Sequence, residues 1–192
     1  MSFARPSASD GPFPESGNRD GPCAPEHARP TYRSWLKFVV LFAIVFVAGT
    51  KAHEATRARL APFLVGTLTV RPSAALINLV TPSEGTKAVG NLLKGQVTIR
   101  VGQGCDGIDC LLLLIAAVLA FPTTWRAKLM ALAAGVPLIY TCNLVRIAAL
   151  YHVQRRAPLY FDLMHAYVGQ TVIIIVGCGF FLLWMRSLAR TE

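Results

Sequence analysis

A polar, glycine-containing segment meets a long apolar run at residues 104–110, Gly-Cys-Asp-Gly-Ile-Asp-Cys. Asp106 directly before the apolar run is a helix N-cap signal, and Asp109 puts a second carboxylate in the first turn, where the helix dipole favours negative charge. Cys105 is therefore expected at, or one residue before, the N-terminus of a helix. A thiol held there loses its proton more readily, and the thiolate is the nucleophilic form. Asp106 opposes this by repulsion, so an activated Cys105 needs a nearby cation.

Cys105 also has a plainer interpretation, because free cysteines are often small buried hydrophobic residues. Its polar and glycine-rich neighbours argue against burial. Cys110 follows the first turn and is expected to be an ordinary helix residue. The C-x4-C spacing of the two is a weak metal or disulfide signal, since zinc sites use tighter spacings in two pairs.

Composition indicates a membrane protein. The 192 residues are 54% hydrophobic with a mean hydropathy of +0.48, which is too apolar for a soluble domain of this size. The formal net charge of +9 is spread along the sequence and is not gathered with aromatic residues into a basic patch, which argues against nucleic acid as a partner. A basic balance instead suits contact with membrane lipid that has anionic head groups.

The hydrophobic runs predict an all-α integral membrane protein with about four transmembrane helices. The predicted spans are residues 35–49, 108–121, 129–150 and 166–185. Residues 60–80 are semi-apolar and are interrupted by Pro62, Arg71 and Pro72, so we predict an interfacial helical segment there and not a clean span. Alternating side chains predict a short strand at residues 95–102.

The chain is expected to divide into a tail and one membrane domain. Residues 1–30 are rich in Pro, Gly and Ser and lack an apolar core, which predicts a disordered cytoplasmic tail. Residues 31–192 are expected to form one polytopic domain, in which residues 81–94 are a polar connection.

Basic residues flanking the spans predict the orientation. The flanks are residues 29–37, 126–128 and 186–190. Placed inside by the positive-inside rule, they put both termini in the cytoplasm and Cys105 at the outer face. Arg155 and Arg156 then fall in a short outer loop and oppose the rule.

Two ionisable residues stand at the outer ends of predicted spans. Arg146 lies inside the third apolar run, where a charge is costly and is expected to face protein or water. Asn143 precedes it by three residues, on the same helix face. His165 opens the last span. Each has a plainer interpretation: Arg146 as an arginine that snorkels to the interface, and His165 as an interfacial histidine.

Considered together, these residues suggest catalysis. The predicted topology places Cys105, Arg146 and His165 at one membrane depth on one side, although they come from three different spans. A thiol, an imidazole and a guanidinium can form a cysteine acyl-transfer site. His165 would take the thiol proton and later protonate the leaving amine. Arg146 would stabilise the thiolate or the oxyanion, and it is also the cation that offsets Asp106.

The chain resembles the exosortase/archaeosortase family of polytopic membrane cysteine transpeptidases. The resemblance rests on Gly-Cys-Asp-Gly-Ile at 104–108 before a span, Asn-Leu-Val-Arg-Ile at 143–147 in the next, and His165 opening the last. It covers about residues 95–185. It implies Cys105 as nucleophile with Arg146 and His165 as catalytic partners, supported by Asn143 and Asp106, and no cofactor or metal.

The resemblance also implies a substrate and a location. Members recognise exported proteins that end in a short motif, a transmembrane helix and a basic tail, the PEP-CTERM type of sorting signal. The enzyme would be a thiol protease or transpeptidase of the bacterial inner membrane, multi-pass, with its site facing the periplasm. It would cleave near the motif and pass the acyl group to an acceptor. Glycines on the spans would let a substrate helix pack closely; these are Gly135, Gly169, Gly177 and Gly179.

Two other classes of function remain open from the residues. A membrane thiol-disulfide oxidoreductase would use Cys105 and Cys110 as a redox pair. A non-catalytic metal-binding membrane protein would use Cys105, His152 and His165 as ligands. We prefer the transpeptidase because neither alternative explains Arg146 within a span.

Overall fold

The computed structural model describes residues 32–102 and 104–190, without the side chains of residues 32–34 and 61. The tail predicted at residues 1–30 lies outside the described residues. Helices dominate the described part, and one small sheet interrupts them. In chain order the elements are α1 (Tyr32–Ala61), the π-helix η1 (Pro62–Val70), α2 (Arg71–Val80), the 3-10 turn η2 (Pro82–Glu84), β1 (Lys87–Val89), β2 (Leu92–Lys94), β3 (Thr98–Arg100), α3 (Ile108–Ala120), α4 (Trp125–Arg156), the 3-10 turn η3 (Pro158–Tyr160), α5 (Phe161–Leu163), the π-helix η4 (Met164–Val168) and α6 (Gly169–Leu188).

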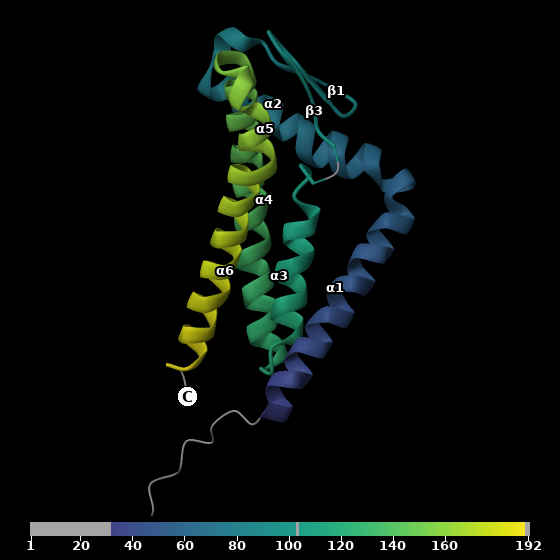
Figure 1. Cartoon of the computed structure of the whole chain (residues 1–192), viewed down its shortest axis with the longest axis vertical. Coiled ribbons are helices and arrows are strands. Elements are labelled where there is room, and N and C mark those ends of the chain that lie inside the picture. The colour runs from purple at the N-terminus through teal and green to yellow at the C-terminus, as the bar shows by residue number, and fades with distance from the viewer. Residues whose placement is uncertain (1–31, 103, 191–192) are drawn as a thin grey trace, which may run out of the picture. The chain divides into compact units, whose positions relative to one another are not determined.

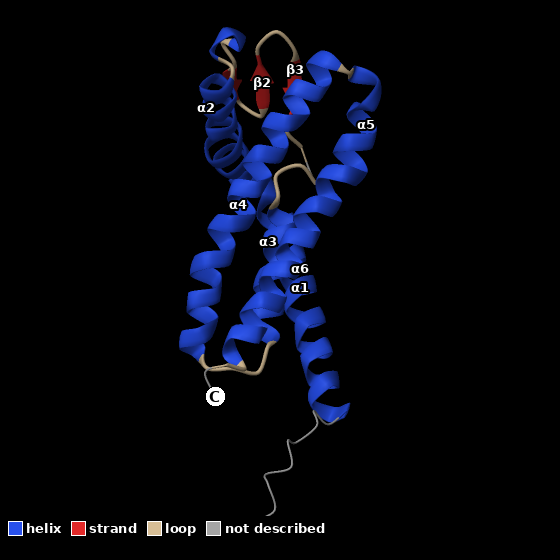
Figure 2. Ribbon diagram, turned by 90° about the vertical axis from the view of Figure 1, so that its left-hand side faces the viewer, coloured by secondary structure: helices blue, strands red, loops and turns tan. Residues whose placement is uncertain are grey.

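A helical bundle forms the main body of the described structure. Helices α1, α3, α4 and α6 lie side by side, with α3 packed against the other three (Figure 1). Close packing depends on Gly135 in α4, because a Cβ there would lie 2.7 Å from Phe180 of α6 and 2.8 Å from Leu114 of α3. We call the end of the bundle that carries the sheet the hairpin end, and the end with the α3–α4 connection the loop end (Figure 2).

The protein is an all-helical integral membrane protein apart from the small sheet. Four stretches of the described chain are long and apolar enough to cross a membrane: Trp35–Leu60, Pro62–Val80, Trp125–Arg156 and Pro158–Leu188. Helix α3 was predicted as a full span at residues 108–121, and that prediction is wrong in length. It has 13 residues, or about 20 Å, against a hydrocarbon thickness of about 30 Å. Its neighbours continue beyond it toward the hairpin end, and the sheet fills the space above it (Figure 1).

The semi-apolar stretch at residues 60–80 forms η1 and α2, one continuous helical run that by length and hydropathy could cross a membrane. Figure 1 shows it lengthwise, passing from the end of α1 toward α4, and Figure 2 shows α2 foreshortened. It therefore runs across the bundle and not along it, which is the direction expected of an interfacial helix. Tyr140 of α4 fixes it by donating a 2.6 Å hydrogen bond to the carbonyl of Leu68.

The sheet is antiparallel in the order β1-β2-β3, with Ala88, Leu93 and Ile99 in register across it. Strand β3 confirms the strand predicted at residues 95–102. Residues 81–94, which were predicted only as a polar connection, contain β1 and β2. Strands of three residues are too short to show a period in the sequence. Gly90, with φ of +59°, makes the turn between them.

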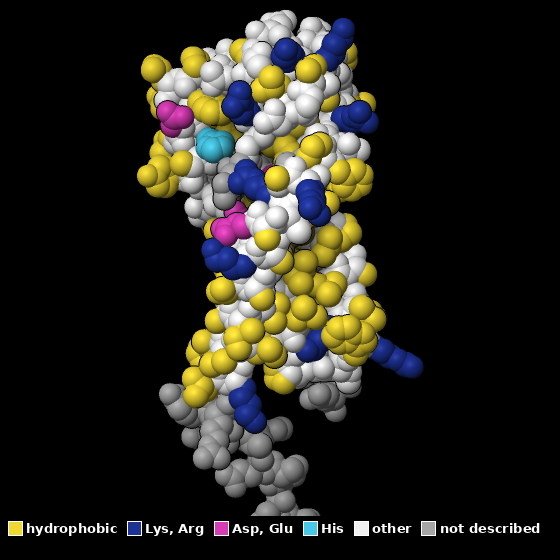
Figure 3. Space-filling view, turned by 90° about the vertical axis from the view of Figure 1, so that its right-hand side faces the viewer, with side chains coloured by type: hydrophobic (Ala, Val, Ile, Leu, Met, Phe, Trp, Pro, Cys, Tyr) yellow, Lys and Arg dark blue, Asp and Glu magenta, His cyan; other side chains and the backbone are white. Residues whose placement is uncertain are grey.

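Two apolar clusters divide the described core. The hairpin-end cluster joins α2, the sheet and the end of α4, and includes Ile77, Leu93, Cys105 and Tyr151. The second cluster lies among α3, α4 and α6, and includes Cys110, Leu114, Ile139 and Ile173. On the face that Figure 3 shows, apolar side chains cover the part of the bundle toward the loop end, with Lys and Arg below them and mixed charges above. This is the pattern of a membrane-embedded belt with polar ends.

Candidate active site

The loop between β3 and α3 presents Cys105. Its backbone N–H donates to the carbonyl of Gly102 at 3.1 Å. Gly104 and Gly107 both have φ of +78°, a left-handed conformation that favours glycine. The Asp106 carboxylate accepts from the Ile108 N–H at 3.3 Å. Asp106 thus satisfies a donor of the first turn as predicted, although by backbone geometry Gly107 is the N-cap residue.

Burial decides the protonation state of Cys105. The residue is 3% exposed and packs in the hairpin-end cluster. Burial raises the pKa of the Cys105 thiol above its ordinary value, the Arg146 guanidinium lowers it, and the Asp106 carboxylate raises it again. The net direction is upward. The expected activation by the helix N-terminus is therefore wrong for this resting structure, because desolvation of a thiolate outweighs the favourable charge.

Two side chains of α4 reach the loop. Asn143 donates from Nδ2 to the carbonyl of Cys105 at 3.4 Å. Arg146 donates from Nη1 to the carbonyl of Gly104 at 3.2 Å. The three-residue spacing does place both on one face of the helix, as predicted. Gly107 makes this approach possible, since a Cβ there would lie 2.6 Å from Asn143 Cγ.

Arg146 also reaches the last helical segment. Its Nη2 donates to the carbonyl of His165 at 3.2 Å. Gly169 leaves room for it, because a Cβ there would lie 2.7 Å from Arg146 Nε. The residue is 7% exposed, so it faces protein and does not snorkel to an interface. One guanidinium therefore joins the backbones of the Cys105 loop and the His165 segment.

His165 lies in η4, and π-helical turns are frequent at functional sites. Its ring stacks on Phe161 with centroids 5.7 Å apart and an interplanar angle of 15°. Among the described residues no hydrogen bond joins this ring to the Cys105 thiol. The structure thus brings the His165 backbone to the site, while its imidazole lies against Phe161. Catalytic hydrogen bonds are often loose without substrate.

Asp106 reveals a part of the site that the sequence did not indicate. Burial raises the pKa of its carboxyl most, the Ile108 N–H lowers it, Asp109 raises it, and His53 and Arg57 of α1 lower it. The far end of α1 therefore contributes positive potential beside the Cys105 loop. No local sequence signal could have found this, since those residues lie about fifty positions earlier.

A buried polar network holds the hairpin end on α4. Tyr151 donates to Glu84 at 3.1 Å and accepts from the Gln96 N–H at 3.1 Å. Glu84 forms an ion pair with Arg155, and its side chain is fully buried. Asn78 exchanges two hydrogen bonds with the backbone of Thr86, at 2.7 and 2.8 Å. No sequence pattern indicated the roles of Tyr151 and Glu84, because the residues that they bind lie more than fifty positions away along the chain.

The alternative functions gain no support. Cys110 belongs to the second cluster and accepts from Gln170 Nε2 at 3.3 Å, whereas Cys105 packs in the first. Both are free cysteines. Within the described ranges, no group of three or more His, Cys, Asp or Glu side chains could hold a metal ion. His152 instead packs edge-on against Tyr151.

Comparison with known proteins identifies the family. The family model of transmembrane exosortases matches residues 87–185, which includes the sheet, the Cys105 loop, α3, α4 and most of α6. No curated protein and no solved structure matches the chain. The match covers more than half of the sequence and contains Cys105, Asn143, Arg146 and His165. The family has a general role in transpeptidase-type sorting at membranes, and the chain belongs to this transmembrane exosortase family.

Proposed function

We propose that this protein is a membrane cysteine transpeptidase in which Cys105 is the nucleophile, His165 the general base and acid, and Arg146 the electrostatic stabiliser. The observation that carries the proposal is the position of Arg146. It is a buried cation inside a membrane helix, and it donates to the carbonyls of Gly104 and His165. A charge in this setting is costly and is retained for function.

The chemistry follows from these three groups. His165 removes the thiol proton, and Cys105 Sγ attacks the carbonyl carbon of the scissile peptide bond, so that an S–C bond forms. Arg146 stabilises the negative oxygen of the tetrahedral intermediate. The C–N bond then breaks, the proton on His165 passes to the leaving amine, and a thioester remains. A nucleophilic acceptor or water attacks the thioester and releases Cys105.

The resting site must rearrange before this can happen. The Cys105 thiol is nearly inaccessible and its pKa is raised by burial, and the His165 ring lies on Phe161. We infer that the substrate opens the loop and turns the imidazole toward the thiol. Arg146 is well placed for this change, because an arginine has five N–H donors and its Nε has no hydrogen-bond partner among the described residues.

We further propose the substrate and the location. The substrates are exported proteins with a C-terminal motif, a transmembrane helix and a basic tail, and the enzyme lies in the bacterial inner membrane with its site toward the periplasm. The site lies at the hairpin end of an apolar belt, where it can meet a motif held just outside a substrate helix. Of the glycines expected to receive that helix, Gly135 and Gly169 instead pack against side chains of this protein.

Replacing single cysteines tests the chemistry. Cys105→Ala is expected to abolish processing of a substrate with such a C-terminus, because no nucleophile remains. Cys110→Ser is the matched control, since Cys110 lies in the other cluster, and it is expected to retain most activity. Processing is followed as the conversion of precursor to shorter product, normalised to membrane-inserted enzyme. Equal loss in both variants would contradict the proposal and favour a redox pair.

A further inference from the structure

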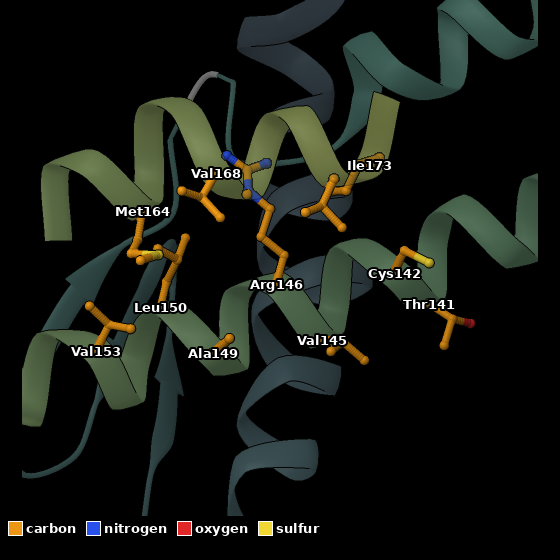
Figure 4. Close-up of a pocket in the computed structure, with 12 residues that line it drawn as sticks. Thr141, Cys142, Val145, Arg146, Ala149, Leu150, Val153, Met164, Val168 and Ile173 are labelled. Atoms are coloured by element: carbon orange, nitrogen blue, oxygen red, sulfur yellow. The ribbon is translucent and has the colours of Figure 1, made fainter. Parts of the chain in front are cut away.

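An apolar groove runs between α4 and the η4–α6 segment on the membrane-facing side of the bundle. Its cavity has a volume of about 340 Å³. Val145, Ala149 and Val153 line one wall, Val168 and Val172 line the other, and Arg146 crosses between them (Figure 4). Val145 and Val172 are 54% and 52% exposed, so the groove opens outward toward lipid. None of the described residues occupies it.

The dimensions of the groove favour a single hydrocarbon chain over a helix. On α4 it extends from Thr141 to Val153, which is about 18 Å of helix. A helix of that length with a diameter of 10–12 Å would occupy about 1,400–2,000 Å³, several times the groove's volume of about 340 Å³. A whole transmembrane helix therefore does not fit inside it, whereas one extended acyl chain does.

The depth of the groove matches the outer leaflet of the bilayer. Lys128, near the loop end of α4, donates to the carbonyl of Leu119 at the end of α3, and we take it as the inner edge of the hydrocarbon. Arg146 then lies about 27 Å above that edge, close to the far side of a core about 30 Å thick. On the same scale the groove extends from about 20 to about 38 Å, from the outer part of that core into the head-group region. Arg156 lies about 42 Å above the edge, from where its long side chain can reach back to the outer head groups.

Arg156 provides a positive charge beside the groove that is complementary to a lipid phosphate. It lies on α4 three residues beyond Val153, which puts it on the groove's face at the hairpin end. It is exposed and makes no ion pair with any described residue, in contrast to its neighbour Arg155, which is paired with Glu84. A free arginine at head-group level attracts the phosphate of an anionic lipid.

We propose that this groove is a binding site for an anionic phospholipid of the outer leaflet, with one acyl chain between α4 and α6 and its phosphate at Arg156. The bound chain would lie against the part of Arg146 that lines the groove, beneath the guanidinium that joins the Cys105 loop to the His165 segment. Binding does not depend on the chemistry at Cys105, so this proposal and the proposed enzyme function can fail separately.

Photocrosslinking tests the site in the full chain. The protein is placed in vesicles of phosphatidylcholine and phosphatidylglycerol at a ratio of about 2:1, with a trace of phosphatidylglycerol that carries a diazirine within one acyl chain. Crosslinked peptides are located by mass spectrometry. Crosslinks are expected on α4 and α6 residues of the groove, above those on the more exposed α1, and excess unlabelled phosphatidylglycerol is expected to reduce them. Equal labelling of α1, α4 and α6 without competition would show unspecific surrounding lipid only and would overturn the proposal.

Matched variants sharpen the test. Val172→Trp fills the groove and is expected to lower groove crosslinks at least fivefold. Ile175→Trp, one turn along α6 at an exposed position outside the groove, is expected to leave them unchanged.

Arg156→Gln is a surface change, and it is expected to reduce the preference for phosphatidylglycerol over a phosphatidylcholine probe about fivefold. An unchanged preference would remove Arg156 from the site. A basic-tailed transmembrane peptide that displaces the lipid probe and crosslinks inside the groove would overturn the proposal in favour of substrate docking.

Discussion

At the scale of single residues, Arg146 combines a charge with a shape, and the two can be separated. Its charge lowers the pKa of the Cys105 thiol, and its planar fork spans two backbone carbonyls. Lys keeps the charge and loses the fork. Arg146→Lys is therefore expected to slow substrate processing about a hundredfold, the usual cost of an oxyanion donor. The pH dependence of the remaining processing is expected to stay close to wild type.

Arg146→Gln is the control for charge. Without the cation the pKa of the Cys105 thiol rises further, so the pH profile of the remaining processing is expected to shift to higher pH. Both variants are compared at equal amounts of membrane-inserted protein. Processing by Arg146→Lys at near the wild-type rate would show that a positive charge suffices, and the proposed role for the fork would have to be given up.

The positions of these residues could be predicted from the sequence, whereas the raised pKa of Cys105 and the position of the His165 ring could not. Cys105, Asn143 and Arg146 do converge, because helix periodicity and span order fix the depth and face of a residue. The raised pKa of Cys105 was missed, since polar neighbours in the sequence suggested exposure that tertiary packing removes. The His165 ring lies against Phe161, four residues earlier. That spacing allows the contact on a helix, but the sequence does not show whether the ring takes it or turns toward Cys105.

At the scale of elements, the short helix α3 and the sheet are complementary. Residues 108–121 were predicted as a full span from hydropathy alone, which does not show how deep in the membrane a helix begins. The structure lowers the start of α3, so that Cys105 lies level with Arg146, and the sheet occupies the space above. Glu84, Tyr151 and Arg155 secure that sheet to α4 through buried contacts. A buried Glu is tolerated only with such partners.

Tyr151→Phe tests whether this network holds the hairpin end in place. The change removes the hydrogen bond to Glu84 and the acceptor for the Gln96 N–H. Loss of these two hydrogen bonds, one buried and one partly buried, is expected to cost about 1–3 kcal/mol. The loss should be local, seen as faster amide hydrogen exchange at residues 84–100 in the detergent-solubilised protein, with slower substrate processing because the sheet leads directly into the Cys105 loop.

Tyr140→Phe provides the matched control on the same helix. Its hydroxyl donates to the carbonyl of Leu68 in η1, a segment that packs on β1 and β2, but this hydrogen bond is exposed and its loss leaves no buried group unpaired. Exchange is expected to increase near Leu68 and to stay unchanged at residues 84–100. Equal exchange of the hairpin in wild type and Tyr151→Phe would show that apolar packing by Leu93 and Ile99 holds the sheet without the network.

At the scale of the whole described domain, hydropathy predicts a membrane protein, but the orientation of its spans was predicted only from the positive-inside rule. Basic residues occur at both ends of the belt: Lys37, Arg126, Lys128 and Arg186 toward the loop end, and Lys87, Lys94, Arg100 and Arg156 toward the hairpin end. The positive-inside rule counts Lys and Arg near spans and gives little weight to acidic neighbours. It therefore does not separate the two ends, and the orientation rests on the proposed sorting function, which requires the site to face exported substrates.

Labelling of single introduced cysteines tests that orientation. Cys105 is a poor reporter because it is 3% exposed, so the five native cysteines are replaced. One new cysteine is then placed at an exposed position at either end, Lys94→Cys in β2 or Arg126→Cys in α4. With a membrane-impermeant maleimide, Lys94→Cys is expected to react in intact spheroplasts and Arg126→Cys only after permeabilisation. The reverse pattern would place Cys105 on the cytoplasmic side, where a motif already carried across the membrane could not reach it.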